Sequence, residues 1–210
     1  MSDNVVGDQQ EAKPNAILYD PVFPVLTASV LLEFDLDTMR SEIYKIASDK
    51  KNAPGGFISE QKDVDTLSQG TELQGAVYQV CLNFLRELKL EFNTEKCSMR
   101  CAINVLRKDG YLPIQQMQHS QVTGMFFVSR PTGTSNLMLH NPTTPLRSHE
   151  HLPMRPQDLT AFTAPSISIE PKENTLYVWP SWLKHELSSM DIGGPLIAIS
   201  FAIDFLPTGV

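Results

Sequence analysis

The sequence has few of the features that mark several large classes of protein. Its three cysteines, Cys81, Cys97 and Cys101, are an odd number without the spacing of a disulfide framework, so we expect free thiols in a reducing compartment. The longest apolar stretch, residues 25–32, is much shorter than the roughly 20 residues of a membrane-spanning helix. The first residues lack the cationic and then apolar order of a signal peptide. We therefore expect a protein of the cytoplasm.

Basic residues are also scarce. The chain has 17 Lys and Arg against 24 Asp and Glu, a net charge of −7, and no segment concentrates the cations. Binding to a phosphate backbone or to anionic lipid depends on clustered positive charge. We therefore expect neither nucleic acid nor membrane as a partner.

The length of 210 residues suits one domain with a short appendage. Residues 1–15 are polar and predict an N-terminal arm, and residues 16–210 predict a single domain. Such an arm has too few apolar side chains to form a core by itself. We expect it either to lie on its own domain or to be held by an assembly partner or a second copy of the chain.

Two kinds of periodicity follow one another along the domain. Apolar residues recur every three or four positions over about 36–50 and about 70–90, which predicts two helices. In the second of these, Cys81 lies within the apolar stripe and is expected in the core. From Met99 onward the period is two, and short β-rich runs separated by Pro, Gly and Asn continue to residue 206. Two helices followed by a β-rich half, about 97–206, predict the α+β class with a sandwich or barrel.

Several motifs in this β-rich half resemble the 2-oxoglutarate/Fe(II)-dependent oxygenases, in particular a small group common in marine bacteria and their phages. The most specific is Trp-Pro-Ser-Trp-Leu-Lys-His at 179–185. Others are Thr-Gly-Met-Phe-Phe-Val at 123–128, Leu-His-Asn-Pro at 139–142, Arg-Lys-Asp-Gly-Tyr at 107–111 and Gly-Gly-Phe at 55–57. They occur in the family's order over about residues 18–206.

The resemblance implies a double-stranded β-helix, or jelly roll, with two flanking N-terminal helices. It also implies Fe(II) held at the mouth by two histidines and a carboxylate, with open positions for 2-oxoglutarate and dioxygen. His185 matches the distal histidine of that set. The cofactors of an active member would be Fe(II) and 2-oxoglutarate.

The chain departs from the family at the other metal ligands. Gln116, Met117 and Gln118 align with the family's His-Xaa-His-Pro, and neutral amides are poor Fe(II) ligands. His119 is one residue out of register, and a shift of one residue on a strand points the side chain to the opposite face. His119 would join His185 as a ligand only if a bulge intervened. If Gln116 and Gln118 faced inward and His119 outward, the enzyme hypothesis would fail.

The co-substrate anchor is missing as well. The family usually holds the distal carboxylate of 2-oxoglutarate with an Arg or Lys near the start of the last strand. Here Gly193, Gly194, Pro195 and Leu196 stand at that place, and Lys184 adjoins His185 and would point away from it. A barrel without the proximal ligand and without the anchor lacks the two features that the chemistry needs most.

A different metal site is a competing hypothesis. His149 and His151 flank Glu150, and an extended segment would put both imidazoles on one face, where His140 or His185 could join them. The surrounding segment is rich in proline and predicts a loop, in which histidines are more often solvated. Asp191 and Asp204, the carboxylates nearest His185 in sequence, lack the usual spacing.

Two functions therefore remain open. The first is a non-catalytic oxygenase-fold protein that serves as a structural or binding module. Its specific form would be a virion or assembly component of a phage, which would be found in the host cytoplasm or in the virion. The second is an active Fe(II)/2-oxoglutarate-dependent dioxygenase that hydroxylates a peptide or small molecule through His185 and His119. Partners of the first would be proteins or a second copy, bound through the arm.

Overall fold

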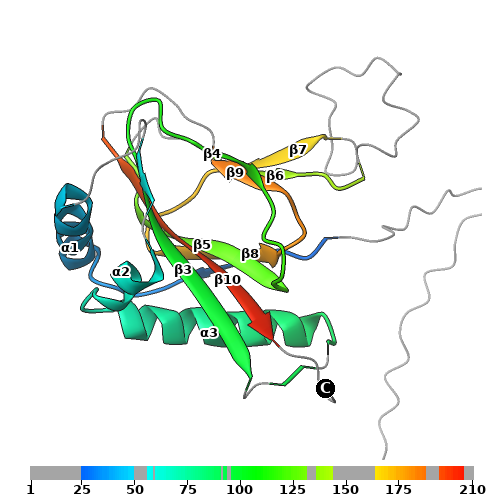
Figure 1. Cartoon of the computed structure of the whole chain (residues 1–210). Helices are drawn as coiled ribbons and strands as arrows, with labels where there is room; N and C mark the ends of the chain where they lie inside the picture. Colours follow the sequence, from blue (N-terminus) through cyan, green and yellow to red (C-terminus); the bar gives the residue numbers. More distant parts are fainter. Residues whose placement is uncertain are drawn as a thin grey trace, which may run out of the picture.

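The computed structural model describes residues 25–49, 56–58, 60–90, 92–93, 96–131, 136–143, 164–187 and 194–205 (Figure 1). Its helices are α1 (Leu36–Asp49), α2 (Gln61–Asp65) and α3 (Gly70–Glu87). Its strands are β1 (Ala28–Leu31), β2 (Gly56–Ile58), β3 (Cys97–Leu106), β4 (Leu112–Gln115), β5 (Val122–Ser129), β6 (Leu137–His140), β7 (Ser166–Ile169), β8 (Thr175–Pro180), β9 (His185–Leu187) and β10 (Leu196–Phe205). The predicted arm, residues 1–15, lies outside the described residues.

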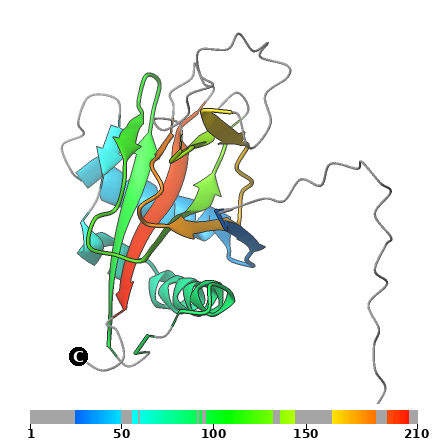
Figure 2. The ribbon, with the colours of Figure 1, turned by 90° about the vertical axis from the view of Figure 1, so that its right-hand side faces the viewer.

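The strands form two antiparallel sheets. Sheet A has six strands in the order β1-β8-β5-β10-β3-β2, and sheet B has four in the order β4-β9-β6-β7. From β3 to β10 the chain passes back and forth between the two sheets, so that strands distant in sequence become neighbours. Figure 2 shows the longest of these pairs, β3 and β10, side by side along their whole length. This is the jelly roll that the resemblance implied, with β1 and β2 added at the two edges of sheet A.

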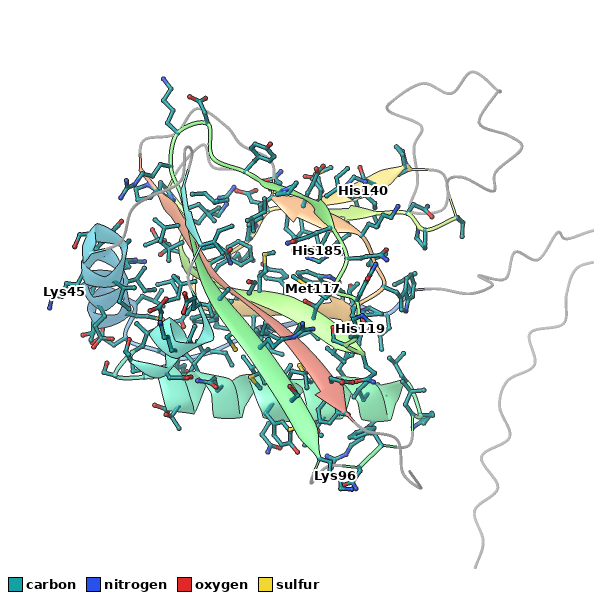
Figure 3. All side chains as sticks on the ribbon, viewed as in Figure 1. Lys45, Lys96, Met117, His119, His140 and His185 are labelled. Carbon is teal, nitrogen blue, oxygen red and sulfur yellow. The ribbon has the colours of Figure 1, made fainter. Side chains whose placement is uncertain are left out.

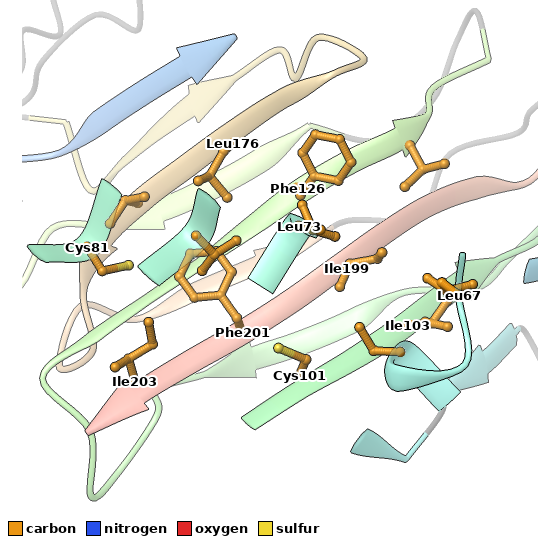
Figure 4. Packing of buried hydrophobic residues seen from close by; sticks show 14 of the residues in the cluster. Leu67, Leu73, Cys81, Cys101, Ile103, Phe126, Leu176, Ile199, Phe201 and Ile203 are labelled. Atoms are coloured by element: carbon orange, nitrogen blue, oxygen red, sulfur yellow. The ribbon is translucent and has the colours of Figure 1, made fainter. Parts of the chain in front are cut away.

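Alternation along the strands of sheet A divides the core into two clusters. On β10, Ile197, Ile199 and Phe201 pack with the helices, whereas Leu196 and Ala198 face the interior of the barrel between the sheets. The helix-side cluster contains the apolar stripe of α3, including Cys81, which is fully buried as expected (Figure 4). Burial raises the pKa of the Cys81 thiol, with a smaller effect of the same sign from Cys101. Cys81 is therefore an unreactive core residue.

The N-terminal helices cover the outer face of sheet A and leave the barrel mouth to the strands. Asp35 precedes α1, and its Oδ1 accepts hydrogen bonds from the backbone N–H groups of Asp37 and Thr38 at 3.1 and 3.2 Å. Such a carboxylate satisfies free N–H groups at the start of a helix. Among the described residues, no helix combines the length and the apolar character needed to cross a membrane.

Gly124 allows the central strands to approach closely. A Cβ atom at this position would lie 2.0 Å from the carbonyl oxygen of Tyr177 and 2.5 Å from Cζ of Phe201. The two neighbours belong to β8 and β10, which flank β5 on either side. Glycine is required here because the contact with the β8 backbone leaves no space for a side chain.

Candidate functional site

The imidazole of His185 lies inside the barrel. His185 is the first residue of β9, which runs between β4 and β6 in sheet B, and it is 0% exposed. Leu187 is also buried, whereas Glu186 between them is only half-buried. The inner face of β9 therefore carries His185 and Leu187, and Figure 3 shows His185 in the space between the two sheets.

The two ring nitrogens of His185 have different surroundings. The indole Nε1 of Trp179 donates to His185 Nδ1 at 3.2 Å, and the carbonyl oxygen of Leu183 lies 3.1 Å from the same Nδ1. His185 Nε2 is buried and has no hydrogen-bond partner among the described residues. The rings of Trp179 and His185 meet edge to face, with centroids 4.9 Å apart.

Burial lowers the pKa of His185 below that of an ordinary histidine. The Leu183 carbonyl acts in the opposite direction because it would accept a proton from the charged ring, and His140 adds to the lowering. A charged imidazole is costly in such a site because it loses its hydration. At neutral pH the ring is therefore neutral and carries its proton on one nitrogen only.

The end of β4 supplies the residues beside His185. Gln115 is the direct partner of His185 across the two strands, and Leu112 is the partner of Leu187. Residues 112–115 of β4 thus lie opposite residues 185–187 of β9, four against three, and this irregularity places both Leu112 and Gln115 on the inner face. Paired residues of antiparallel strands point to the same side of the sheet, so the Gln115 side chain shares the inner face with His185.

This irregularity changes the register expected from the sequence. Gln116 and Gln118 are exposed, and Met117 between them is half-buried. The inward positions at the end of β4 therefore carry Gln115 and Met117. The enzyme hypothesis was to fail if Gln116 and Gln118 faced inward and His119 outward. Gln116 and Gln118 do not face inward, so this test does not exclude the enzyme. The two side chains that do face inward, an amide and a thioether, are nevertheless weak ligands for Fe(II).

His119 and His140 lie apart from this inner face. His119 is exposed in the turn between β4 and β5, where its φ is 60°. His140 is on the outer face of sheet B, with its Nε2 3.3 Å from Oε1 of Glu186, and Figure 3 shows it on the side of the sheet away from His185. Among the described residues, no three His, Cys, Asp or Glu side chains come together as a metal site. His149, Glu150, His151 and Asp191 lie outside the described residues.

The deeper part of the barrel is neutral where the co-substrate anchor would be expected. Leu196 and Ala198 face inward from β10, followed by Ser200. The Ser200 hydroxyl accepts a hydrogen bond of 2.9 Å from Nδ2 of Asn104, which also donates to the carbonyl oxygen of Ala198. Gly193 lies outside the described residues.

A cation at the barrel mouth was missed in the sequence. Arg100 shares a face of β3 with Asn104, and its Nη2 donates to the carbonyl oxygen of Gln118 at 3.3 Å. Arg100 lies two steps of two residues before Asn104, so the alternation of a strand places both on one face. Because Arg100 is exposed, it lies at the rim and not at the depth where a 2-oxoglutarate carboxylate is usually anchored.

Of two pockets, one borders the neighbours of His185 and the other lies away from them. Leu139 is the cross-strand partner of His185, and Trp179 donates a hydrogen bond to it. A hollow of about 200 Å³ is bordered by residues of β1, β6, β7 and β8, Trp179 and Leu139 among them. A second, of about 410 Å³, is lined by Arg130, Glu170, Pro171, Lys172 and Glu173 around the turn before β8. That turn is at the opposite end of β8 from Trp179, so the larger pocket does not belong to the barrel mouth.

Comparison with known proteins finds a family that part of the chain resembles. A family described as "Putative 2OG-Fe(II) oxygenase" matches residues 100–202, the stretch that contains β4, β9 and His185. The match covers just under half of the chain, and over this stretch the chain is similar to that family. No match was found among curated proteins.

Solved structures of oxygenases share the jelly roll. A prolyl-4-hydroxylase from Pseudomonas putida is 11% identical, with a TM-score of 0.58 over 87% of this chain and 93% of its own. A viral collagen prolyl hydroxylase from Paramecium Bursaria Chlorella virus-1 is 12% identical, with a TM-score of 0.50 over 84% and 94%. HygX from Streptomyces hygroscopicus, solved with nickel and 2-oxoglutarate bound, is 9% identical, with a TM-score of 0.55 over 88% and 84%. At these identities the likeness concerns the fold.

The described residues of this oxygenase-like chain do not fit the iron that the matched family implies. His185 Nε2 is one buried nitrogen aimed into the barrel, but the inner positions beside it carry Gln115 and Met117. The inner face of β10 carries no cation for a dicarboxylate. A buried dianion without a paired cation is strongly unfavourable. The metal and the co-substrate therefore both lack partners in the described part of the barrel.

Proposed function

We propose that this chain is a non-catalytic member of the 2OG-Fe(II) oxygenase family that serves as a structural or binding module. The observation that carries the proposal is the pairing of His185 with Gln115, followed by Met117 at the next inward position. His185 thus has no second imidazole and no carboxylate beside it on the inner faces of β4 and β9. Fe(II) held by one imidazole, an amide and a thioether would bind weakly.

The filling of the barrel supports the same proposal. Large apolar side chains from both sheets meet in the interior, including Phe127, Leu137, Leu187 and Leu196, all fully buried. Such packing stabilises the frame, and it uses space that a co-substrate and a substrate would otherwise occupy. The barrel is suited to hold a fixed shape, with its exposed rim and edges available to a partner.

Turnover of 2-oxoglutarate tests the proposal. The purified full chain is incubated with Fe(II), ascorbate, dioxygen and 2-oxoglutarate, and succinate is measured. We expect succinate at the level of the His185→Ala variant, because that variant lacks the buried imidazole that the described part of the barrel supplies. Succinate formation well above that level would instead support the alternative, an active dioxygenase of a peptide or small molecule.

We further propose that residues 1–15 act as the attachment arm of this module, to a protein partner or to a second copy. The virion or assembly component of a phage is the specific form of this proposal, and it rests on the occurrence of the family's relatives in phages. Light scattering on the full chain and on a chain that begins at residue 16 tests whether residues 1–15 bind a second copy. A larger mass for the full chain supports a second copy, and equal monomeric masses contradict it.

A further inference from the structure

Trp179 and His185 form a buried donor and acceptor pair. Trp179 is 1% exposed and His185 is 0% exposed, and the indole Nε1 lies 3.2 Å from His185 Nδ1. An indole nitrogen can only donate. The His185 Nδ1 that accepts this hydrogen bond must therefore present its lone pair and carry no proton.

The Leu183 carbonyl competes for the same nitrogen. Its oxygen lies 3.1 Å from Nδ1 and would accept a hydrogen bond if Nδ1 were protonated. One Nδ1 cannot both donate to Leu183 and accept from Trp179. If it donated, the buried indole N–H would lose its acceptor. If it accepts, the carbonyl loses a donor, and buried carbonyl groups tolerate this better than buried N–H groups do. The indole hydrogen bond is therefore the one that determines the tautomer.

We propose that Trp179 is a positioning residue that holds His185 as the tautomer protonated on Nε2 and so withholds it from metal ions. A metal binds the lone pair of an imidazole nitrogen, and here the nitrogen that faces the barrel interior carries the proton. Binding a metal would move that proton to Nδ1, opposite the indole N–H, and would leave a buried donor unpaired. His185 instead presents an N–H donor inside the barrel, which a water molecule or a carbonyl oxygen can satisfy. This inference deepens the proposed non-catalytic function and rests on it.

Nuclear magnetic resonance measures the tautomer directly. Long-range proton–nitrogen spectra of the full chain, with histidine labelled with nitrogen-15 and with EDTA present, distinguish protonated from unprotonated ring nitrogens. The His185 signals are identified by their loss in His185→Asn. We expect Nε2 protonated and Nδ1 unprotonated at neutral pH. A protonated Nδ1 in the unaltered chain would overturn the inference.

The variant Trp179→Phe tests the cause, and Trp182→Phe is its matched control. Trp182 lies three residues further along and is 52% exposed, so the same substitution there removes an indole that does not contact the imidazole in this way. We expect Trp179→Phe to move the proton to Nδ1, where it is donated to Leu183, and Trp182→Phe to leave the tautomer unchanged. An unchanged tautomer in a folded Trp179→Phe would contradict the inference.

Metal affinity gives a second readout. The substitutions Gln115→His and Met117→Asp place an imidazole at the inward end of β4 and a carboxylate two residues beyond it, where Figure 3 shows Met117 between the sheets. In this double variant, adding Trp179→Phe is expected to strengthen Co(II) binding roughly tenfold or more, because no buried indole donor is then left unpaired. Equal affinity with and without Trp179→Phe would contradict the inference. Iron binding by the unaltered chain would instead contradict the proposed function, whatever the tautomer measured in EDTA.

Discussion

Gln115 is the direct cross-strand partner of His185. The two side chains share the inner face of sheet B, where the Cβ atoms of such a pair are about 4.5–5.5 Å apart. Met117 follows two residues later and is half-buried. The described inner face thus carries one buried imidazole, while the adjacent inward positions carry side chains with little affinity for Fe(II).

Rebuilding the site tests this arrangement. In Gln115→His/Met117→Asp, an imidazole and a carboxylate would face His185, the ligand types of a facial site. We expect Co(II) affinity to rise at least about tenfold over the unaltered chain, or about 1.4 kcal/mol. Absorption of Co(II) in the visible range and calorimetry measure the binding.

The matched control makes the same substitutions in the other register. Gln116→His/Gln118→Asp introduces the same side chains at exposed positions, and we expect it to leave Co(II) affinity close to that of the unaltered chain. If this control gained the metal and the first variant did not, the inward register of β4 would be wrong.

His185 should make the stability of the fold depend on pH. Burial lowers the pKa of His185 in the folded protein. The Leu183 carbonyl partly offsets this lowering, and His140 adds to it. In the unfolded chain the pKa is about 6.5. The unfolded state therefore binds the proton more readily once the pH falls below about 6.5. We expect the free energy of unfolding to decrease as the pH falls from about 7 toward the lowered pKa of the folded state. Chemical denaturation at a series of pH values measures the slope.

Two variants separate His185 from other titrating groups. His185→Asn keeps an acceptor near the position of Nδ1 but does not titrate in this range, so its stability should depend less on pH. His140→Gln removes an imidazole on the outer face and should retain most of the dependence. Equal slopes in His185→Asn and the unaltered chain would refute this assignment.

Gly124 should tolerate no side chain. Gly124→Ala would bring a methyl group to 2.0 Å from the Tyr177 carbonyl oxygen, so the strands of sheet A must move apart. We expect a loss of about 1–3 kcal/mol in the free energy of unfolding, typical of overpacking. Gly75, on α3, is the control because a Cβ there meets nothing within 4 Å. Gly75→Ala should stabilise by up to about 1 kcal/mol through helix propensity. Similar stabilities of the two variants in urea would contradict this account.

Much of the fold could be predicted from periodicity. The helices expected over about 36–50 and 70–90 run over Leu36–Asp49 and Gly70–Glu87, because long apolar stripes give a strong signal. The long strands β3, β5 and β10 were also found, since two-residue alternation or continuous apolar runs mark them. The short helix α2 and the short strands β2, β4 and β9 were not predicted, because three to five residues carry too little periodicity.

The site depended on details that periodicity does not contain. The resemblance placed His185 inside the barrel, and it is buried there. The register of Gln115 and Met117 could not be predicted, because one extra residue between Leu112 and Gln115 reverses the inward face. The hydrogen bond from Trp179 to His185 crosses the turn between β8 and β9. Only the folded chain brings these two side chains together. Trp182, three residues after Trp179, lies exposed in that turn.

The most direct test of the central claim is an anaerobic titration of Fe(II) into the full chain with 2-oxoglutarate present. Oxygenases of this family that chelate 2-oxoglutarate on iron show a metal-to-ligand charge-transfer band in the visible range. We predict no band beyond that of Fe(II) and 2-oxoglutarate in buffer, and no rise in melting temperature with Fe(II), Mn(II) or Co(II). A band that forms with the unaltered chain and is lost in His185→Ala would contradict the account and establish a working iron site.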